Sequence, residues 1–423
     1  MLAPAPPTAA PAAVDERADL DLLAGPDAEE LLRAVLAAEG VELETWSTHA
    51  VHHRPGVGVT VGWAVTWTLG AARGEEYLLG TTAPLPGNQP ALQVVELAGR
   101  VVRVWRHPVD PALPGLATAS SREALAVTLG PVNGLELVTY RPLRRAVLRA
   151  RTPDRTVYLK VVRPHTAVLL EQRHTMLSAA GLPVAPAELH DDGVLVLGEV
   201  SGTPLTQAFA DDGAARVRPG DVLALLDRFP VEVLGLKRRP SWAERVADHA
   251  GAAAAALPGS AQRIAALTAT ITDLLRRSDA GPVVPTHGDL HDGNLLLDGP
   301  TITGLLDIDS VGPGHRVDDL ACLLAHVSVL PALAPEIHRH VPGALQHWTE
   351  ALATTVDPLS LYARTGAVVL SLVAGARMPG DPAWRQGAEA RLDIAAEWVA
   401  QARSLRDLSP GAPRPLIGAE HLG

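Results

Sequence analysis

The stretch that decides the fold runs from Pro285 to Ser310 and reads Pro-Thr-His-Gly-Asp-Leu-His-Asp-Gly-Asn-Leu-Leu-Leu-Asp-Gly-Pro-Thr-Ile-Thr-Gly-Leu-Leu-Asp-Ile-Asp-Ser. It contains two short apolar runs, 295–298 and 302–306, separated by a Gly-Pro turn signal. Two apolar runs joined by such a turn predict a β-hairpin. We call residues 285–310 the polar hairpin, because polar side chains flank both of its strands.

Three oxygen-bearing side chains are expected to converge at the open end of the polar hairpin. Asn294 directly precedes the first strand and Asp307 directly follows the second, so closing the hairpin brings them side by side. Asp289 lies in the loop five positions before Asn294. Mg²⁺ takes oxygen ligands and usually only one or two from protein, with water and phosphate completing its shell. The sequence therefore predicts Asn294 and Asp307 as magnesium ligands and leaves Asp289 as a base.

The order and spacing of these residues also match a known pattern. The wording His-Gly-Asp-Leu-His-x-Gly-Asn, followed by Leu-Leu-Asp-Ile-Asp, resembles the aminoglycoside phosphotransferase and choline kinase family, with Asp292 where proline is common. The arrangement is that of a kinase catalytic loop and its metal-binding aspartate. The resemblance covers about residues 135–405. It implies an α+β fold of protein kinase-like, bilobal form, with a small β-rich N-lobe and a helical C-lobe, and ATP with Mg²⁺ as cofactors.

A lysine and a glutamate upstream fit the same pattern. Lys160 lies in the middle of the apolar run 157–162, where a lysine is costly unless it is paired. Glu171 lies on the helix expected to follow, and the two fit the lysine–glutamate pair that grips the ATP phosphates in kinases. The turn 141–145 contains no glycine, so a Gly-rich phosphate loop is missing.

Further roles come from the resemblance alone. It implies that the link carrying Glu199 and Ser201 is the hinge where backbone groups meet adenine. It places His291 near the transferred phosphate, as a second catalytic residue beside the base. It also implies that one aspartate after the polar hairpin braces the catalytic loop. Asp319, directly before Leu-Ala, matches that position, and Asp318 is its rival.

The chain is expected to divide into five parts. An Ala/Pro-rich and then charged start predicts a disordered tail, and a helix followed by extended runs predicts a small, separate α+β cap module that ends in a Pro-rich boundary. The cap module lies outside the resemblance, although maltokinases and similar bacterial sugar kinases look alike in carrying such a cap. The predicted ranges are 1–24 for the tail, 25–110 for the cap, 120–200 for the N-lobe, 201–408 for the C-lobe and 409–423 for a second tail.

The charge and composition of the chain limit the classes of partner that we expect it to bind. The net charge of −11 argues against a grip on nucleic-acid phosphates. The single cysteine, Cys322, permits no internal disulfide and fits a reducing cytoplasm. The start of the chain lacks a signal-peptide pattern, and the longest apolar run, 365–376, is too short to span a bilayer. We therefore expect a cytoplasmic protein with a small-molecule hydroxyl substrate and neither nucleic-acid nor membrane partners; its oligomeric state stays undetermined.

Three readings of function follow. The first is ATP-dependent phosphorylation of an aminoglycoside, sugar or amino sugar, with the acceptor in the C-lobe near Trp242 and Glu244. The second is a catalytically silent, ATP-binding regulatory protein with the same fold. The third is a metallo-phosphohydrolase, because Gly288-Asp289 and Gly293-Asn294 resemble two-metal phosphatase signatures. That class also needs an upstream Asp-x-His, which the sequence lacks before residue 288.

Overall fold

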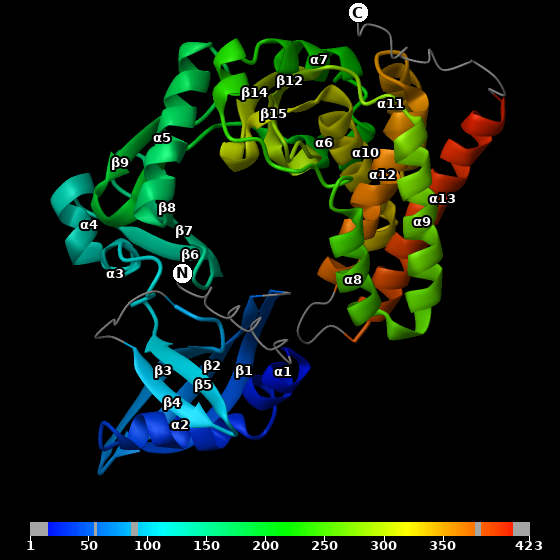
Figure 1. Ribbon diagram of the computed structural model, residues 1–423. Helices are drawn as coiled ribbons and strands as arrows, with labels where there is room; N and C mark the ends of the chain where they lie inside the picture. The colour runs from blue at the N-terminus through cyan, green and yellow to red at the C-terminus, as the bar shows by residue number, and fades with distance from the viewer. Residues whose placement is uncertain (1–15, 55–56, 86–91, 377–381, 409–423) are drawn as a thin grey trace, which may run out of the picture. The chain divides into compact units, whose positions relative to one another are not determined.

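The computed structural model describes residues 16–54, 57–85, 92–376 and 382–408 (Figure 1). These residues form two compact units. The first comprises the chain up to Gln172 together with Ala187–Glu199, and the second comprises Arg173–Pro186 and the chain from Val200 onward. Two predicted regions, residues 1–15 of the first tail and the whole tail 409–423, lie outside the described residues.

The first unit begins with the predicted cap. Two helices cover one face of a five-stranded antiparallel sheet in the order β1-β2-β3-β5-β4 (Figure 1). Val59, Val61 and Trp63 alternate along β2 and are fully buried beneath these helices, as expected for strand residues that share one face. The elements are α1 (Glu16–Ala24), α2 (Ala28–Ala37), β1 (Glu42–Arg54), β2 (Gly58–Leu69), β3 (Ala72–Thr81), β4 (Gln93–Leu97) and β5 (Arg100–Arg106).

Helix α1 corrects the prediction of a disordered tail, which was wrong for residues 16–24. Leu22 and Leu23 are buried in the cap core, and the carbonyl of Leu23 accepts a hydrogen bond of 3.0 Å from Trp63 Nε1. A short helix of charged composition is marginal alone, and burial of its leucines stabilises it. The contact that orders α1 lies forty residues away in sequence, on β2.

The rest of the first unit is the predicted β-rich lobe. Its sheet has the order β6-β7-β8-β10-β9, and α5 (Pro164–Ala179) follows β8 in the chain. Two short helices, α3 (Leu116–Ala119) and α4 (Arg122–Leu129), precede the sheet, and Leu116 and Leu125 pack against its strands. The strands are β6 (Gly134–Arg141), β7 (Arg145–Arg151), β8 (Thr156–Val162), β9 (Ala187–His190) and β10 (Val194–Gly198).

The Pro-rich segment after β5 joins the cap to this lobe instead of separating them. Asp110 is 3% exposed, and its carboxylate accepts hydrogen bonds from Tyr140 Oη at 2.7 Å and from the amide of Leu143 at 2.9 Å. Leu143 also packs against Leu79 and Trp105 of the cap sheet. The structure thus differs from the predicted separate module, because these contacts make the cap and the β-rich lobe one unit.

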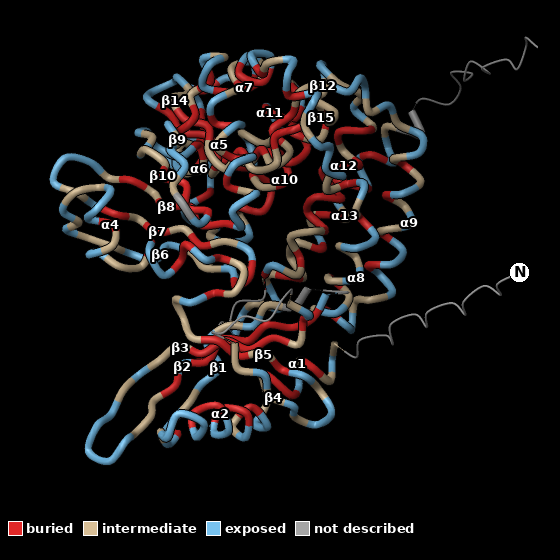
Figure 2. The backbone as a smooth tube through the Cα atoms, turned by 60° about the vertical axis from the view of Figure 1, so that its left-hand side comes forward, coloured by how far each residue is buried: buried red, intermediate tan, exposed pale blue. Residues whose placement is uncertain are grey.

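The second unit is helical around the polar hairpin. Helices α10 (Arg316–Leu333) and α12 (Pro358–Leu372) are largely buried, as the red segments in Figure 2 show. Within the described residues, the stretch Pro358–Ala376 has the length and apolar composition of a membrane span, but 67% of it is buried inside the fold. The remaining helices are α6 (Leu205–Asp212), α7 (Pro219–Asp227), α8 (Val246–Ala256), α9 (Ala261–Arg277), α11 (Val341–Ala353) and α13 (Trp384–Leu408).

The predicted fold class is confirmed: an α+β chain with an N-terminal cap, a β-rich lobe and a helical lobe of protein kinase-like form. Helix α11 begins at Val341, and Pro342 lies in its first turn, where the backbone needs no amide hydrogen bond. Helix α6 was not predicted, since its eight residues are too few to show a clear period.

Candidate active site

The polar hairpin folds as predicted and brings its two polar ends together. β13 (Leu295–Asp298) and β14 (Thr301–Leu305) pair antiparallel, with Leu295 opposite Leu305. Beyond this pair, the amide of Leu306 donates to the carbonyl of Asn294 at 2.8 Å. Asn294 and Asp307 therefore lie at the open end of the hairpin, where the sequence predicted the magnesium ligands.

His287 fixes the loop from inside. Its ring is fully buried, Nδ1 accepts from the amide of Asp289 at 3.3 Å, and Nε2 lies 2.9 Å from the carbonyl of Leu306. Because an amide can only donate and a carbonyl can only accept, the ring proton is on Nε2. Burial lowers the pKa of His287, which favours this neutral form. The imidazole thus ties the loop before Asp289 to the end of β14.

The structure distinguishes the two aspartates that follow the hairpin. Asp319 is fully buried, and its two carboxylate oxygens accept the amides of His287 and Gly288, both at 2.8 Å. Asp318 pairs instead with Arg364 of α12 at 2.5 Å. Asp319 therefore braces the loop. Burial raises the pKa of its carboxyl to about 7, and the two amide donors oppose that rise.

One face of α10 contacts the loop at three successive points. Asp319, Cys322 and His326 follow a three-then-four spacing, which places them on one helix face. Asp319 holds the loop amides, the Cys322 thiol lies 3.9 Å from Asp289 Oδ1, and the His326 ring stacks on that of His291. Burial raises the pKa of the Cys322 thiol well above its usual value, so it stays protonated and can donate to Asp289.

The sequence interpretation missed the last two of these residues. The sequence predicted no site role for Cys322, which is 1% exposed and contacts the predicted base. The sequence predicted no role for His326. The available signal was its position two helical turns after Asp319, because that spacing repeats a helix face.

The two predicted metal ligands, Asn294 and Asp307, are each held in a defined conformation. Asn294 is buried, and its Nδ2 donates to the carbonyl of Asp289 at 3.0 Å. This bond leaves the amide oxygen of Asn294 as its ligand atom. Asp307 adopts a left-handed conformation with φ +50° and ψ +53°, which is uncommon for a residue with a side chain. Such outliers concentrate at functional sites, and here the residue is a predicted metal ligand.

In the first unit, Lys160 and Glu171 lie on facing surfaces. Lys160 is 6% exposed in β8 and pairs in register with Leu195 of β10. Leu195 and Val162 pack against Leu170 of α5, and Lys160 shares their face of the sheet. Lys160 therefore points to the side that α5 covers. Glu171, the neighbour of Leu170, is half-buried on that helix. Their direct pairing stays a prediction.

The remaining predicted residues are less constrained. Glu199 and Ser201 are both exposed, the first at the end of the first unit and the second at the start of the corresponding segment of the second. Trp242 is half-buried, with the Arg245 guanidinium 4.9 Å from its ring centroid. Glu244 accepts from Arg238 at 2.6 Å and from the Ser241 amide at 2.7 Å, so its contacts are those of a local turn.

Comparison with known proteins gives a family for this site. A model described as the phosphotransferase enzyme family matches residues 143–353, a span that contains the whole polar hairpin. No curated protein sequence matches the chain.

Solved structures align to most of their own length but with TM-scores below 0.5. A spectinomycin phosphotransferase in complex with ADP and spectinomycin is 14% identical, covers 67% of this chain and 97% of its own, and has a TM-score of 0.44. A choline kinase from Streptococcus pneumoniae is 16% identical over 66% of this chain and 97% of its own, with a TM-score of 0.44. A type VIII aminoglycoside-3'-phosphotransferase is 25% identical over 59% and 98%, with a TM-score of 0.38.

The family assignment therefore rests on the sequence match, which begins at Leu143 in the β-rich lobe, ends in α11 and leaves the cap outside. Within that span lies the loop held by Asp319, which carries Asp289, predicted as the base, and Asn294, predicted as a metal ligand. On this match, residues 143–353 of the chain are assigned to the phosphotransferase enzyme family.

Proposed function

We propose that the protein is a cytoplasmic, ATP-dependent phosphotransferase that moves the γ-phosphate to a hydroxyl group of a small molecule, of the aminoglycoside, sugar or amino sugar class. The observation that carries the proposal is the bracing of the loop by Asp319, which holds two consecutive amides directly before Asp289. Phosphoryl transfer depends on positioning and charge neutralisation more than on covalent help, so a rigidly held loop is what it needs.

The residues at the open end of the hairpin suit a magnesium–nucleotide complex. Asn294 offers an amide oxygen, because its Nδ2 is engaged by the carbonyl of Asp289, and Asp307 offers a carboxylate. Oxygen donors of this kind are those that Mg²⁺ prefers. When bound, the metal would neutralise charge on the phosphates. In the first unit, Lys160, fixed by Glu171, would hold the phosphates, and the hinge at Glu199 and Ser201 would meet adenine.

Asp289 would orient the acceptor hydroxyl and take its proton. The carboxylate is half-buried, and Oδ1 faces the Cys322 thiol. The backbone of Asp289 is held on both sides, because its amide donates to His287 and its carbonyl accepts from Asn294. These bonds fix the main chain and leave the side chain to meet the substrate. His291, two residues later, would donate a hydrogen bond to the transferred phosphate.

The test is ADP release by the purified full-length protein with Mg²⁺-ATP across a panel of aminoglycosides, hexoses, hexosamines, maltose, choline and homoserine. At least one compound should raise ADP release in the wild type. Asp289→Asn should lower the stimulated rate by roughly 10²- to 10⁴-fold, the usual contribution of a positioned general base. Asp298→Asn is the matched control, because Asp298 is exposed at the other end of the same hairpin.

The outcomes separate the alternatives. Full activity of Asp289→Asn would refute the assignment of the base. Stabilisation of the protein by Mg²⁺-ATP in a thermal melt, with no stimulated turnover by any compound, would favour the silent regulatory protein. Phosphate release from a phosphomonoester with Mn²⁺ or Zn²⁺ and without ATP would favour the metallo-phosphohydrolase.

A further inference from the structure

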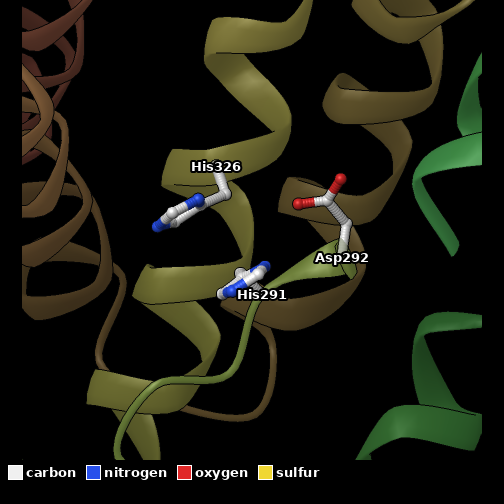
Figure 3. A group of neighbouring side chains, drawn as sticks. All are labelled: His291, Asp292 and His326. Atoms are coloured by element: carbon white, nitrogen blue, oxygen red, sulfur yellow. The ribbon is translucent and has the colours of Figure 1, made fainter. Parts of the chain in front are cut away.

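Two imidazole rings stack beside the predicted base. His291 lies on the loop of the polar hairpin, and His326 comes from the middle of α10. Their ring centroids are 4.6 Å apart and their planes differ by 17°, so the rings lie almost face to face (Figure 3). Both residues are half-buried. This stacking is the third contact between the loop and α10, in addition to the contacts that Asp319 and Cys322 make.

A metal site is the first explanation to consider, and the geometry opposes it. His291, Asp292 and His326 offer donor atoms that lie within 4.8 Å of one another. A metal must lie in the plane of each ligating imidazole, about 2.0–2.1 Å from its nitrogen. The His291 and His326 rings have centroids 4.6 Å apart and planes that differ by 17°, so a single ion beside the stack cannot lie in both ring planes. Asp292 is also engaged, since its Oδ2 accepts from Thr206 Oγ1 at 2.5 Å.

The hydrogen bonding of His291 fixes where its proton is. Nδ1 accepts the amide of Gly293 at 3.1 Å. An amide nitrogen can only donate, so Nδ1 carries a lone pair and the proton of the neutral ring is on Nε2. The Nε2–H group is then the donor that His291 offers. A single bond at one ring nitrogen still allows rotation of the ring about Cβ–Cγ, so a second contact is needed to fix its plane.

We propose that His326 is a positioning residue, whose stacked ring holds the plane of the His291 imidazole so that its Nε2–H is directed at the transferred phosphate. The inference rests on the proposed function, in which His291 is that donor. Stacked aromatic rings attract each other, and this attraction favours one mutual orientation of the two rings. Since α10 also fixes the loop through Asp319, the helix sets both the position of the loop and the direction of its imidazole.

The surroundings of His326 suit this role. Burial, together with smaller contributions from His291 and from Arg391 of α13, lowers the pKa of His326 to about 3. His326 is therefore neutral near pH 7 and places no positive charge under the His291 ring. A neutral ring gives orientation without changing the charge of the site.

The test compares two variants that differ in the ring alone. His326→Ala removes the stacked ring, whereas His326→Phe keeps an aromatic ring that has no ring nitrogens. Tyr362→Ala is the matched control, because it removes another aromatic contact of the same helical unit, with Trp398 at 5.2 Å, outside the loop. The first measurement is the ring ¹⁵N spectrum of His291 in histidine-labelled full-length protein, with and without Mg²⁺-ADP, assigned by the signal lost in His291→Asn.

The second measurement is ADP release with Mg²⁺-ATP and the compound of the panel that stimulates the wild type most. We expect one Nε2–H tautomer for His291 in the wild type and in His326→Phe, and a mixture in His326→Ala. We expect kcat to fall roughly tenfold to a hundredfold in His326→Ala, as for misplaced catalytic groups, with the KM for ATP nearly unchanged. His326→Phe and Tyr362→Ala should keep most of kcat.

Two results would overturn the proposal. One is an unchanged His291 tautomer and kcat in His326→Ala. The other is a loss in His326→Phe as large as that in His326→Ala, which would show that a ring nitrogen of His326 acts directly. The ¹⁵N spectrum is read without an acceptor, so it decides the positioning role even if no compound of the panel stimulates the wild type. That last result would count against the proposed function instead.

Discussion

At the scale of single residues, the arrangement of the site depends on one buried carboxylate. Asp319 accepts two consecutive amides of the loop, and neither of its neighbours could replace it in that geometry. Asp318 lies one position earlier on the same helix and points to Arg364. Adjacent helix positions do not face the same way, so only one of the two aspartates can reach the loop.

We predict that Asp319→Ala destabilises the protein by roughly 2–4 kcal/mol, because it leaves two buried amides without an acceptor. Urea unfolding followed by circular dichroism measures the change. Asp298→Ala removes an exposed carboxylate from the same hairpin and should change the free energy of unfolding by less than about 0.5 kcal/mol. Equal effects of the two substitutions would contradict the bracing role of Asp319.

At the scale of elements, the loop before β13 lies in close contact with the turn after β14. Gly288 has φ +78°, and a Cβ added there would lie 2.6 Å from the carbonyl oxygen of Ser310. Gly299, in the turn at the other end of the hairpin, has φ +57° but open space around it. Gly288 and Gly299 both have a left-handed backbone conformation, but only at Gly288 would an added Cβ clash with a neighbouring atom.

This difference gives a paired prediction for the hairpin. Gly288→Ala and Gly299→Ala should each cost about 1 kcal/mol for the left-handed backbone. Gly288→Ala should cost roughly 1–3 kcal/mol more for the clash and should also lower stimulated ADP release, because it moves the loop that carries Asp289. Chemical unfolding and the ADP assay test both points. Equal stability and activity of the two variants would show that the loop tolerates a shift.

At the scale of the whole molecule, the cap is joined to the β-rich lobe at the turn between β6 and β7. Asp110 accepts from Tyr140 and Leu143, and Leu143 itself packs against the cap sheet. Burial raises the pKa of Tyr140, so its hydroxyl stays protonated and donates. The cap and the lobe therefore share a buried polar contact and an apolar one.

We predict that Asp110→Ala lowers the stability of the first unit by roughly 2–4 kcal/mol, because two buried donors lose their acceptor. Hydrogen exchange should rise together in β3, β5 and the β6–β7 turn, since all of them meet at this contact. Asp154→Ala, in the exposed turn between β7 and β8, serves as the control. Faster exchange confined to the cap, with the β6–β7 turn unaffected, would show that the two modules are independent.

The sequence by itself determined the local features of this protein. The apolar run 157–162 predicted β8, and the two apolar runs around Gly299 predicted the hairpin that brings Asn294 to Asp307. These features depend on neighbours in the chain, so the sequence carries them directly. The position of Lys160 within an apolar strand was visible for the same reason.

Tertiary structure alone decided which side chains meet across the fold. The choice of Asp319 over Asp318, the contact of Cys322 with Asp289 and the stacking of His326 on His291 all depend on how α10 packs against the loop. The order of α1 and the union of the cap with the β-rich lobe depend on burial by distant residues. Side-chain periodicity defines the faces of an element, whereas the packing of elements decides what each face touches.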